Sequence, residues 1–282
     1  MRHCSLFVIV VALTLLIVGR SEALDLGNIM PLGDSITAGY TPSGGVPGGY
    51  RQELFNSLTA AGFSFEFVGS QTTYPSDSLK SAGQQCHEGH NAYTIQQIID
   101  GVKTSNWLSV NPDIVLLHIG ANDVLNTDAA TAPDRLDALI GEILAQKPNA
   151  KVIVAKIIGG STVTNASNAT AYDAGIVTYN AAIEQKVAAR AQAGEHVSLV
   201  DMYSILNINH QADSKGTILF ADISHPNQTG YDLMGDTWAG AIKAVATPEP
   251  GTIGLLVSGL FGIGIHAWRK RRQNYRRQTE RR

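Results

Sequence analysis

The feature that most constrains the fold of this chain is the regular alternation of short apolar runs with longer amphipathic segments. The run 113–119 is the most continuous, as is typical of a central strand in a parallel sheet. Further strands are predicted at 28–34, 65–69, 151–158 and 196–201. Helices are predicted at 49–61, 94–104, 133–146, 172–193 and 227–245. This alternation predicts an α/β fold of three layers, with a five-stranded parallel sheet and helices on both faces.

The flavodoxin-like strand order 2-1-3-4-5 is the natural expectation for five such strands. In that order the chain reverses direction between strands 1 and 3, and a crevice opens at their carboxyl ends. Ser35 follows the first predicted strand, and Asn122 follows the third. We therefore expect the two side chains to meet at one edge of the sheet.

Residues 1–23 have the features of a secretory signal. Arg2 and His3 precede an apolar run at 6–18, and small residues at Ser21 and Ala23 predict cleavage before Leu24. The alternative is a retained membrane anchor, which the short apolar run disfavours. We expect residues 24–247 to form one domain.

The C-terminal segment 248–282 begins with Pro-Glu-Pro, continues with an apolar stretch at 252–268 and ends in an arginine-rich tail. The apolar stretch would span about 25 Å as a helix, enough for one membrane crossing with the tail in the cytoplasm. This arrangement resembles the PEP-CTERM sorting signal of Gram-negative bacteria, which implies an exosortase-like processing enzyme as a partner. An ordinary C-terminal anchor is the alternative. Both place the domain at the cell surface or outside the cell, with membrane contact only through this segment before processing.

The charge of the expected domain differs from that of the whole chain. Residues 24–247 hold 11 Lys and Arg against 21 Asp and Glu, a formal charge of −10, whereas the whole chain carries −3. An acidic domain argues against nucleic acid as a partner. Cys86 is its sole cysteine, so no disulfide can form within it, and we expect a small buried side chain rather than a nucleophile.

Three short motifs supply the groups that acyl transfer requires. Ser35, in Gly-Asp-Ser, is the candidate nucleophile. His225 is the best base among the eight histidines because Asp222, three residues earlier, can hold the ring. The alternative is that this Asp-x-x-His-Pro-Asn run caps a helix. Asn122 offers an amide donor for an oxyanion, and the Ser35 backbone N–H offers a second.

Together the motifs containing Ser35, Asn122, Asp222 and His225 resemble those of the SGNH (GDSL-type) hydrolases. The resemblance implies a serine esterase without a cofactor, in which these residues are the nucleophile, an oxyanion donor, the acid and the base. The segments 48–51, 61–70 and 87–90 resemble carbohydrate esterase family 3. That resemblance implies removal of acetyl groups from a polysaccharide such as xylan. The alternatives are a lipolytic esterase or thioesterase on the same site, or a surface protein that binds polysaccharide without turnover.

One position departs from the family pattern. The resemblance implies a third oxyanion donor, the backbone N–H of a glycine in a Ser-Gly pair, and this chain has Asn91 and Ala92 there. We expect Ala92 rather than Gly89 to be the donor. A left-handed backbone at an alanine costs about 1–2 kcal/mol.

The polar neighbours of these motifs complete the set of candidate residues. Asp34, Asp123 and His90 are expected to contact substrate. No metal site is expected, because the potential ligands in 87–90 lack a further cluster.

Overall fold

The computed structural model describes residues 24–126, 128–162 and 167–246. The expected signal at 1–23 and the sorting segment at 248–282 lie outside the described residues. Within the described part of the chain, no helix is long and apolar enough to cross a membrane.

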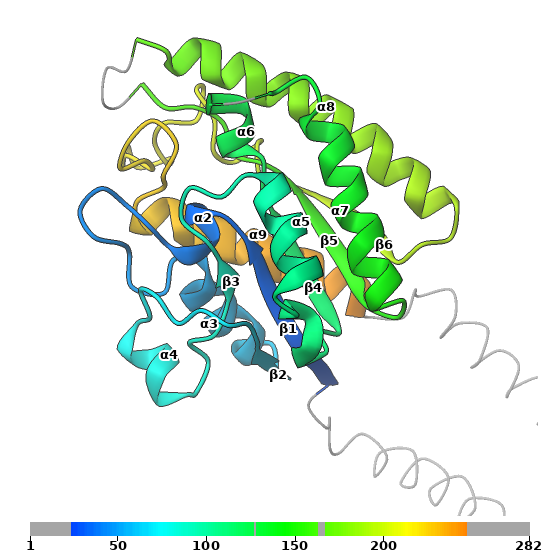
Figure 1. Cartoon of the computed structure of the whole chain (residues 1–282). Coiled ribbons are helices and arrows are strands. Elements are labelled where there is room, and N and C mark those ends of the chain that lie inside the picture. The colour runs from blue at the N-terminus through cyan, green and yellow to red at the C-terminus, as the bar shows by residue number, and fades with distance from the viewer. Residues whose placement is uncertain (1–23, 127, 163–166, 247–282) are drawn as a thin grey trace, which may run out of the picture. The chain divides into compact units, whose positions relative to one another are not determined.

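The strands of the described residues form one parallel sheet (Figure 1). Their bounds are β1 Leu24–Gly33, β2 Phe63–Phe67, β3 Glu88–Gly89, β4 Ile114–His118, β5 Lys151–Lys156 and β6 Val197–Asp201. The order is β2-β1-β4-β5-β6. Since the third, fourth and fifth predicted strands are β4, β5 and β6, this is the predicted order 2-1-3-4-5. All five predicted strands are present, and a further strand of two residues, β3, pairs with β1 beyond the end of β2. Two residues within a polar loop carry no periodicity, which is why the sequence does not reveal this strand.

Helices cover the sheet on both faces (Figure 1). The long helices are α3 Tyr50–Ala60, α5 Ile95–Thr104, α7 Ala132–Gln146, α8 Ala169–Gln192 and α9 Gln228–Ala246. Helices α5, α7 and α8 lie on one face, and α3 and α9 on the other. The last two approach so closely that a Cβ on Gly235 would lie 2.7 Å from the Tyr50 carbonyl oxygen.

The short helices are not predicted by the sequence. They are α2 Ser35–Ala38, α4 Asp77–Ser81, α6 Ala121–Asn126 and a 3₁₀ turn at Trp107–Val110. Helices of one or two turns are too short to show a 3.6-residue pattern. Two of them, α2 and α6, follow directly on β1 and β4 and so begin at the carboxyl edge of the sheet.

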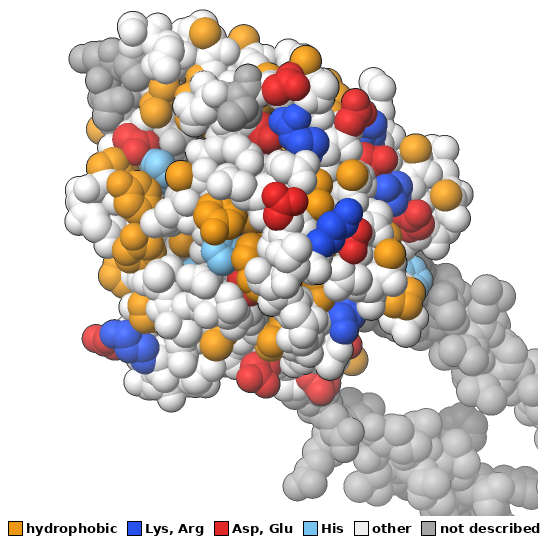
Figure 2. Space-filling model, viewed as in Figure 1, with side chains coloured by type: hydrophobic (Ala, Val, Ile, Leu, Met, Phe, Trp, Pro, Cys, Tyr) orange, Lys and Arg blue, Asp and Glu red, His pale blue; other side chains and the backbone are white. Residues whose placement is uncertain are grey.

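The core lies between the sheet and the helix layers. All five residues of β4 are buried, as expected for a central strand with both faces covered. Figure 2 shows acidic and basic side chains beside one another on part of the surface. One ion pair of the described residues joins Lys186 Nζ to Asp134 Oδ1 at 2.7 Å.

Candidate active site

The turn after β1 presents Ser35 at the carboxyl edge of the sheet. Asp34 caps α2 because its Oδ1 accepts a hydrogen bond from Ile36 N–H at 3.0 Å. Ser35 is the first residue of α2, so its backbone N–H has no acceptor within the helix. Gly33 is required here, since a Cβ would lie 2.0 Å from the carbonyl oxygen of His118. Ser35 thus begins a helix at the carboxyl edge of the sheet, where the strand order predicts a crevice.

The imidazole of His225 joins Ser35 to Asp222. Ser35 Oγ lies 2.9 Å from His225 Nε2, and His225 Nδ1 lies 2.7 Å from Asp222 Oδ2. The other carboxylate oxygen of Asp222 accepts the backbone N–H groups of Ser224 and His225, at 2.8 and 2.7 Å. Burial by itself raises the pKa of Asp222, but the hydrogen bond from His225 and the backbone bonds outweigh it, so the pKa lies below its usual value. A carboxylate that stays ionised in this way stabilises a protonated imidazole.

The helix-cap interpretation of Asp222 is wrong. Helix α9 begins at Gln228, and the residue before it, Asn227, accepts Gly230 N–H with its side-chain oxygen at 3.1 Å. Asn227 therefore caps the helix, and the Asp222 carboxylate is left to hold the turn and the imidazole.

The backbone of Ala92 has the left-handed conformation that a glycine would favour, with φ +63°. Ala92 lies in a turn closed by a hydrogen bond from Tyr93 N–H to the His90 carbonyl at 3.2 Å. The N–H of Gly89 already donates to His87 Nδ1 at 3.0 Å. Among the described residues no acceptor is found for the N–H of Ala92. Of the two candidate donors, Ala92 is thus the one that remains available.

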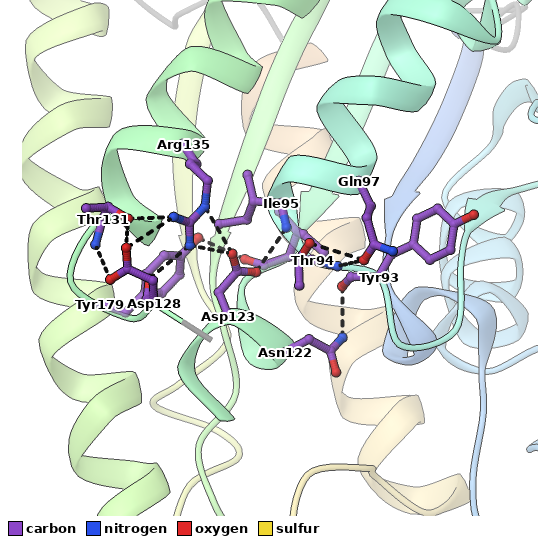
Figure 3. Close-up of polar contacts among 11 residues, drawn as sticks. Tyr93, Thr94, Ile95, Gln97, Asn122, Asp123, Asp128, Thr131, Arg135 and Tyr179 are labelled. Atoms are coloured by element: carbon purple, nitrogen blue, oxygen red, sulfur yellow. Dashed lines mark hydrogen bonds and ion pairs between the residues drawn. The ribbon is translucent and has the colours of Figure 1, made fainter. Parts of the chain in front are cut away.

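Asn122 lies on α6, where the turn after β4 sets its direction. Its Nδ2 donates to the Tyr93 carbonyl at 2.9 Å (Figure 3). An amide nitrogen has two hydrogens, so the second can serve an oxyanion. Gly120 has φ +126° and lies against the Tyr179 ring, which a Cβ would approach to 2.6 Å. Only glycine fits this turn.

The three residues expected to contact substrate lie beneath the site or beside it. Asp34 is fully buried and Asp123 is 1% exposed. Burial raises the pKa of Asp34 to about 7, and its Oδ2 has no hydrogen-bond partner among the described residues. His90 Nε2 lies 2.6 Å from Glu88 Oε1, and the His90 ring stacks on Trp107 at 4.3 Å between centroids. These contacts favour a supporting role over contact with substrate.

The possible ligands in 87–90 are bonded within the protein. His87 Nε2 lies 3.2 Å from Thr73 Oγ1, and burial lowers the pKa of His87 to about 2. Glu88 accepts the backbone N–H and the hydroxyl of Ser70, both at 2.7 Å. The part of the chain that the structure describes holds no group of three His, Cys, Asp or Glu side chains able to bind a metal. Cys86 is partly exposed, and burial raises the pKa of its thiol.

Two residues beside the site, Tyr40 and Arg51, are not among the candidates that the sequence predicts. The Tyr40 ring packs edge-on against the His225 imidazole, with 4.9 Å between centroids. Arg51 is fully buried and donates to the carbonyls of Ala38, Thr73 and Gln85 at 3.0–3.2 Å. Burial lowers the pKa of Arg51 to about 10. Tyr40 lies in no periodic pattern of the sequence. Arg51 lies in the segment 48–51, whose resemblance to carbohydrate esterase family 3 could have pointed to it.

A serine, an imidazole and a carboxylate joined in series, beside available amide donors, define the class of serine hydrolases. Residues 32–233 match the GDSL-like lipase/acylhydrolase family, and the chain belongs to this family. Residues 246–272 match the PEP-CTERM protein-sorting motif.

The chain is similar to known esterases in sequence and in structure. A multidomain esterase of Ruminococcus flavefaciens is 30% identical over 81% of this chain, and the chain spans 30% of its length. A family 3 carbohydrate esterase of Clostridium thermocellum is 34% identical, with a TM-score of 0.59, over 78% of this chain and 98% of that one. The family 3 carbohydrate esterase of Talaromyces cellulolyticus, 24% identical, covers 78% and 97% with a TM-score of 0.58, and shares the fold. Residues 32–233 thus form a GDSL-like lipase/acylhydrolase domain that is similar to a family 3 carbohydrate esterase.

Proposed function

We propose that residues 24–247 form an exported esterase that removes acetyl groups from a polysaccharide. The observation that carries this proposal is the series of contacts from Ser35 through His225 to Asp222, at 2.9 and 2.7 Å. The similarity to family 3 carbohydrate esterases supports the acetyl group as the acyl part and a polysaccharide as the alcohol.

In the proposed mechanism Ser35 Oγ attacks the acetyl carbonyl while His225 Nε2 takes its proton. The N–H groups of Ser35 and Ala92 and the second hydrogen of the Asn122 amide stabilise the oxyanion. The imidazolium, stabilised by Asp222, then returns the proton to the departing sugar hydroxyl. Water then attacks the acetyl-serine while His225 takes its proton. The imidazolium returns that proton to Ser35 Oγ, and acetate leaves.

A second candidate function is polysaccharide binding without turnover. The feature that favours it is the alanine at position 92, where the family pattern has a glycine. The intact contacts of Ser35 with His225 argue for turnover.

Hydrolysis by the full chain of p-nitrophenyl acetate, p-nitrophenyl octanoate and acetylated xylan tests the proposal, with Ser35→Ala as the control. We expect acetate release from xylan, little cleavage of the octanoate ester and no turnover by the variant. Preferred cleavage of the octanoate ester would replace the proposal by a lipolytic one. Binding of xylan by a folded protein with no turnover would support the second candidate.

The proposed export has its own test. The PEP-CTERM match supports a role for an exosortase-like enzyme in processing residues 248–282. Mass spectrometry of the protein recovered from the cell surface and medium should show Leu24 at the N-terminus and loss of the tail. An intact tail on all recovered protein would favour an ordinary anchor.

A further inference from the structure

Two consecutive residues of α6 hold the segment that follows Ala92. Asn122 Nδ2 donates to the Tyr93 carbonyl at 2.9 Å, and Asp123 Oδ2 accepts Ile95 N–H at 3.0 Å (Figure 3). Ile95 is the first residue of α5, so the Asp123 carboxylate also faces the positive end of that helix. Together the contacts fix the turn of Ala92 against the helix that carries Asn122.

Arg135 on α7 holds Asp123 from the other side. Its Nη2 lies 2.8 Å and its Nε 3.3 Å from Asp123 Oδ1. The guanidinium is held in turn by the Asp128 carbonyl, at 2.9 Å, and by Thr131 Oγ1, at 2.5 Å. The side chain of Asp123 is 1% exposed and that of Arg135 is 21% exposed. A carboxylate buried to this extent depends on its hydrogen-bond partners to stay in place.

From this geometry we propose that Arg135 is a positioning residue for the oxyanion hole. Through Asp123 it sets the spacing between the N–H of Ala92 and the amide of Asn122. This inference rests on the proposed function, because it takes both groups as oxyanion donors. Such donors act at about 2.7–3.1 Å from the oxyanion, and a displacement of about 1 Å is enough to lower the rate by up to about 100-fold.

Helix α7 also supplies a matched control. Asp137 on α7 pairs with Arg190 on α8, with Arg190 Nε 2.6 Å from Asp137 Oδ1 and Nη2 2.7 Å from the Asp137 carbonyl. The arginine side chain is 17% exposed, close to the value for Arg135. This pair joins two helices and has no contact with the segment after Ala92. Arg190 Nη1 also lies 2.7 Å from Glu195 Oε2, so Arg190→Met removes both ion pairs and reports the effect of their loss on stability alone.

The first experiment measures p-nitrophenyl acetate hydrolysis by full chains carrying Arg135→Met, Arg135→Lys or Arg190→Met. We expect Arg135→Met to lower kcat by about 10- to 100-fold with KM changed by less than about 3-fold, since the defect is in the transition state. Arg135→Lys should recover part of the loss, and Arg190→Met should stay within about 3-fold of the original chain. Equal kcat for Arg135→Met and Arg190→Met would overturn the proposal.

A double-mutant cycle with Asn122→Ala shows whether Arg135 acts through the oxyanion hole. If it does, Arg135→Met should lower kcat by a clearly smaller factor in the Asn122→Ala background than in the original chain, because one of the two donors that Arg135 positions is already missing. The same loss in both backgrounds would assign Arg135 a purely structural role. If Arg135→Met does not fold, Arg135→Lys completes the same cycle.

Inactivation by diethyl p-nitrophenyl phosphate separates this inference from the proposed substrate. Phosphorylation of Ser35 needs the oxyanion donors but no sugar, so Arg135→Met should slow it in step with kcat. A chain that reacts with the phosphate triester but releases no acetate from xylan would disprove the polysaccharide proposal alone. A chain that neither reacts with the triester nor hydrolyses p-nitrophenyl acetate would overturn both proposals.

Discussion

The two sides of the site are built in different ways. On the side of Ser35 and His225 the supporting bonds are local: Asp34 reaches two residues along the chain, and Asp222 reaches three. On the side of Ala92 and Asn122 the supporting bonds join residues 28 and 29 positions apart. Local turns thus hold the nucleophile and base, whereas the packing of α5, α6 and α7 holds the oxyanion donors. The first side should depend on individual side chains, and the second on the tertiary structure around it.

The largest expected effect is on the side of the base. Asp222→Asn should lower kcat by about 10⁴-fold, because an amide cannot stabilise the imidazolium and favours the wrong tautomer. Steady-state hydrolysis of p-nitrophenyl acetate measures it. Asp213→Asn is the matched control, since Asp213 also accepts two backbone N–H groups, at 2.8 Å each, in an exposed turn. A loss below about 100-fold for Asp222→Asn would mean that the local turn alone orients His225.

The buried carboxyl of Asp34 should make stability depend on pH. Burial raises its pKa to about 7, whereas an unfolded Asp titrates near about 3.9. The folded protein therefore binds the proton more tightly, and the free energy of unfolding should fall by up to about 4 kcal/mol as pH rises from about 4 to about 7. Asp34→Asn should remove this slope, and denaturant titrations at a series of pH values measure it. An unchanged slope in the variant would show that another group causes it.

Asn122→Ala tests the oxyanion side directly. Loss of one donor should lower kcat by about 100- to 1000-fold with little change in KM. Asn91→Ala is the control: Asn91 is exposed and donates to the Tyr74 hydroxyl at 3.2 Å, so its variant should stay within about 3-fold. Equal effects of the two substitutions would remove Asn122 from the set of donors.

The smallest expected effect is at Ala92. Ala92→Gly should raise the free energy of unfolding by about 0.5–1 kcal/mol, because relief of the left-handed strain exceeds the entropy that glycine adds to the unfolded chain. Ala82→Gly is the control, since Ala82 has φ −87° and should lose about 0.4–1 kcal/mol instead. Chemical denaturation of both variants measures the difference. A loss of stability in both would mean that Ala92 is not strained.

The same contrast explains what the sequence could predict. The order of the long strands follows from their apolar runs, and it brings Ser35 and Asn122 to the same sheet edge. The spacing of Asp222 and His225 is a local pattern, and the structure joins the two residues. The direction of the Asn122 amide, the φ of Ala92 and the pair of Asp123 with Arg135 depend on how three helices pack. No sequence period encodes that packing.

Strand β1 pairs with both β2 and β3, so segment 68–87 leaves the sheet and returns to the same strand. Its two ends are thereby fixed a few residues apart on β1, and Arg51 ties its interior to the Ala38 carbonyl. The entropic cost of closing a loop with fixed ends rises slowly with its length, by about 0.6 kcal/mol for each doubling. Extra residues inserted at the exposed positions of this segment would therefore cost little stability, and Ser35, which begins α2 just after the end of β1, would keep its place.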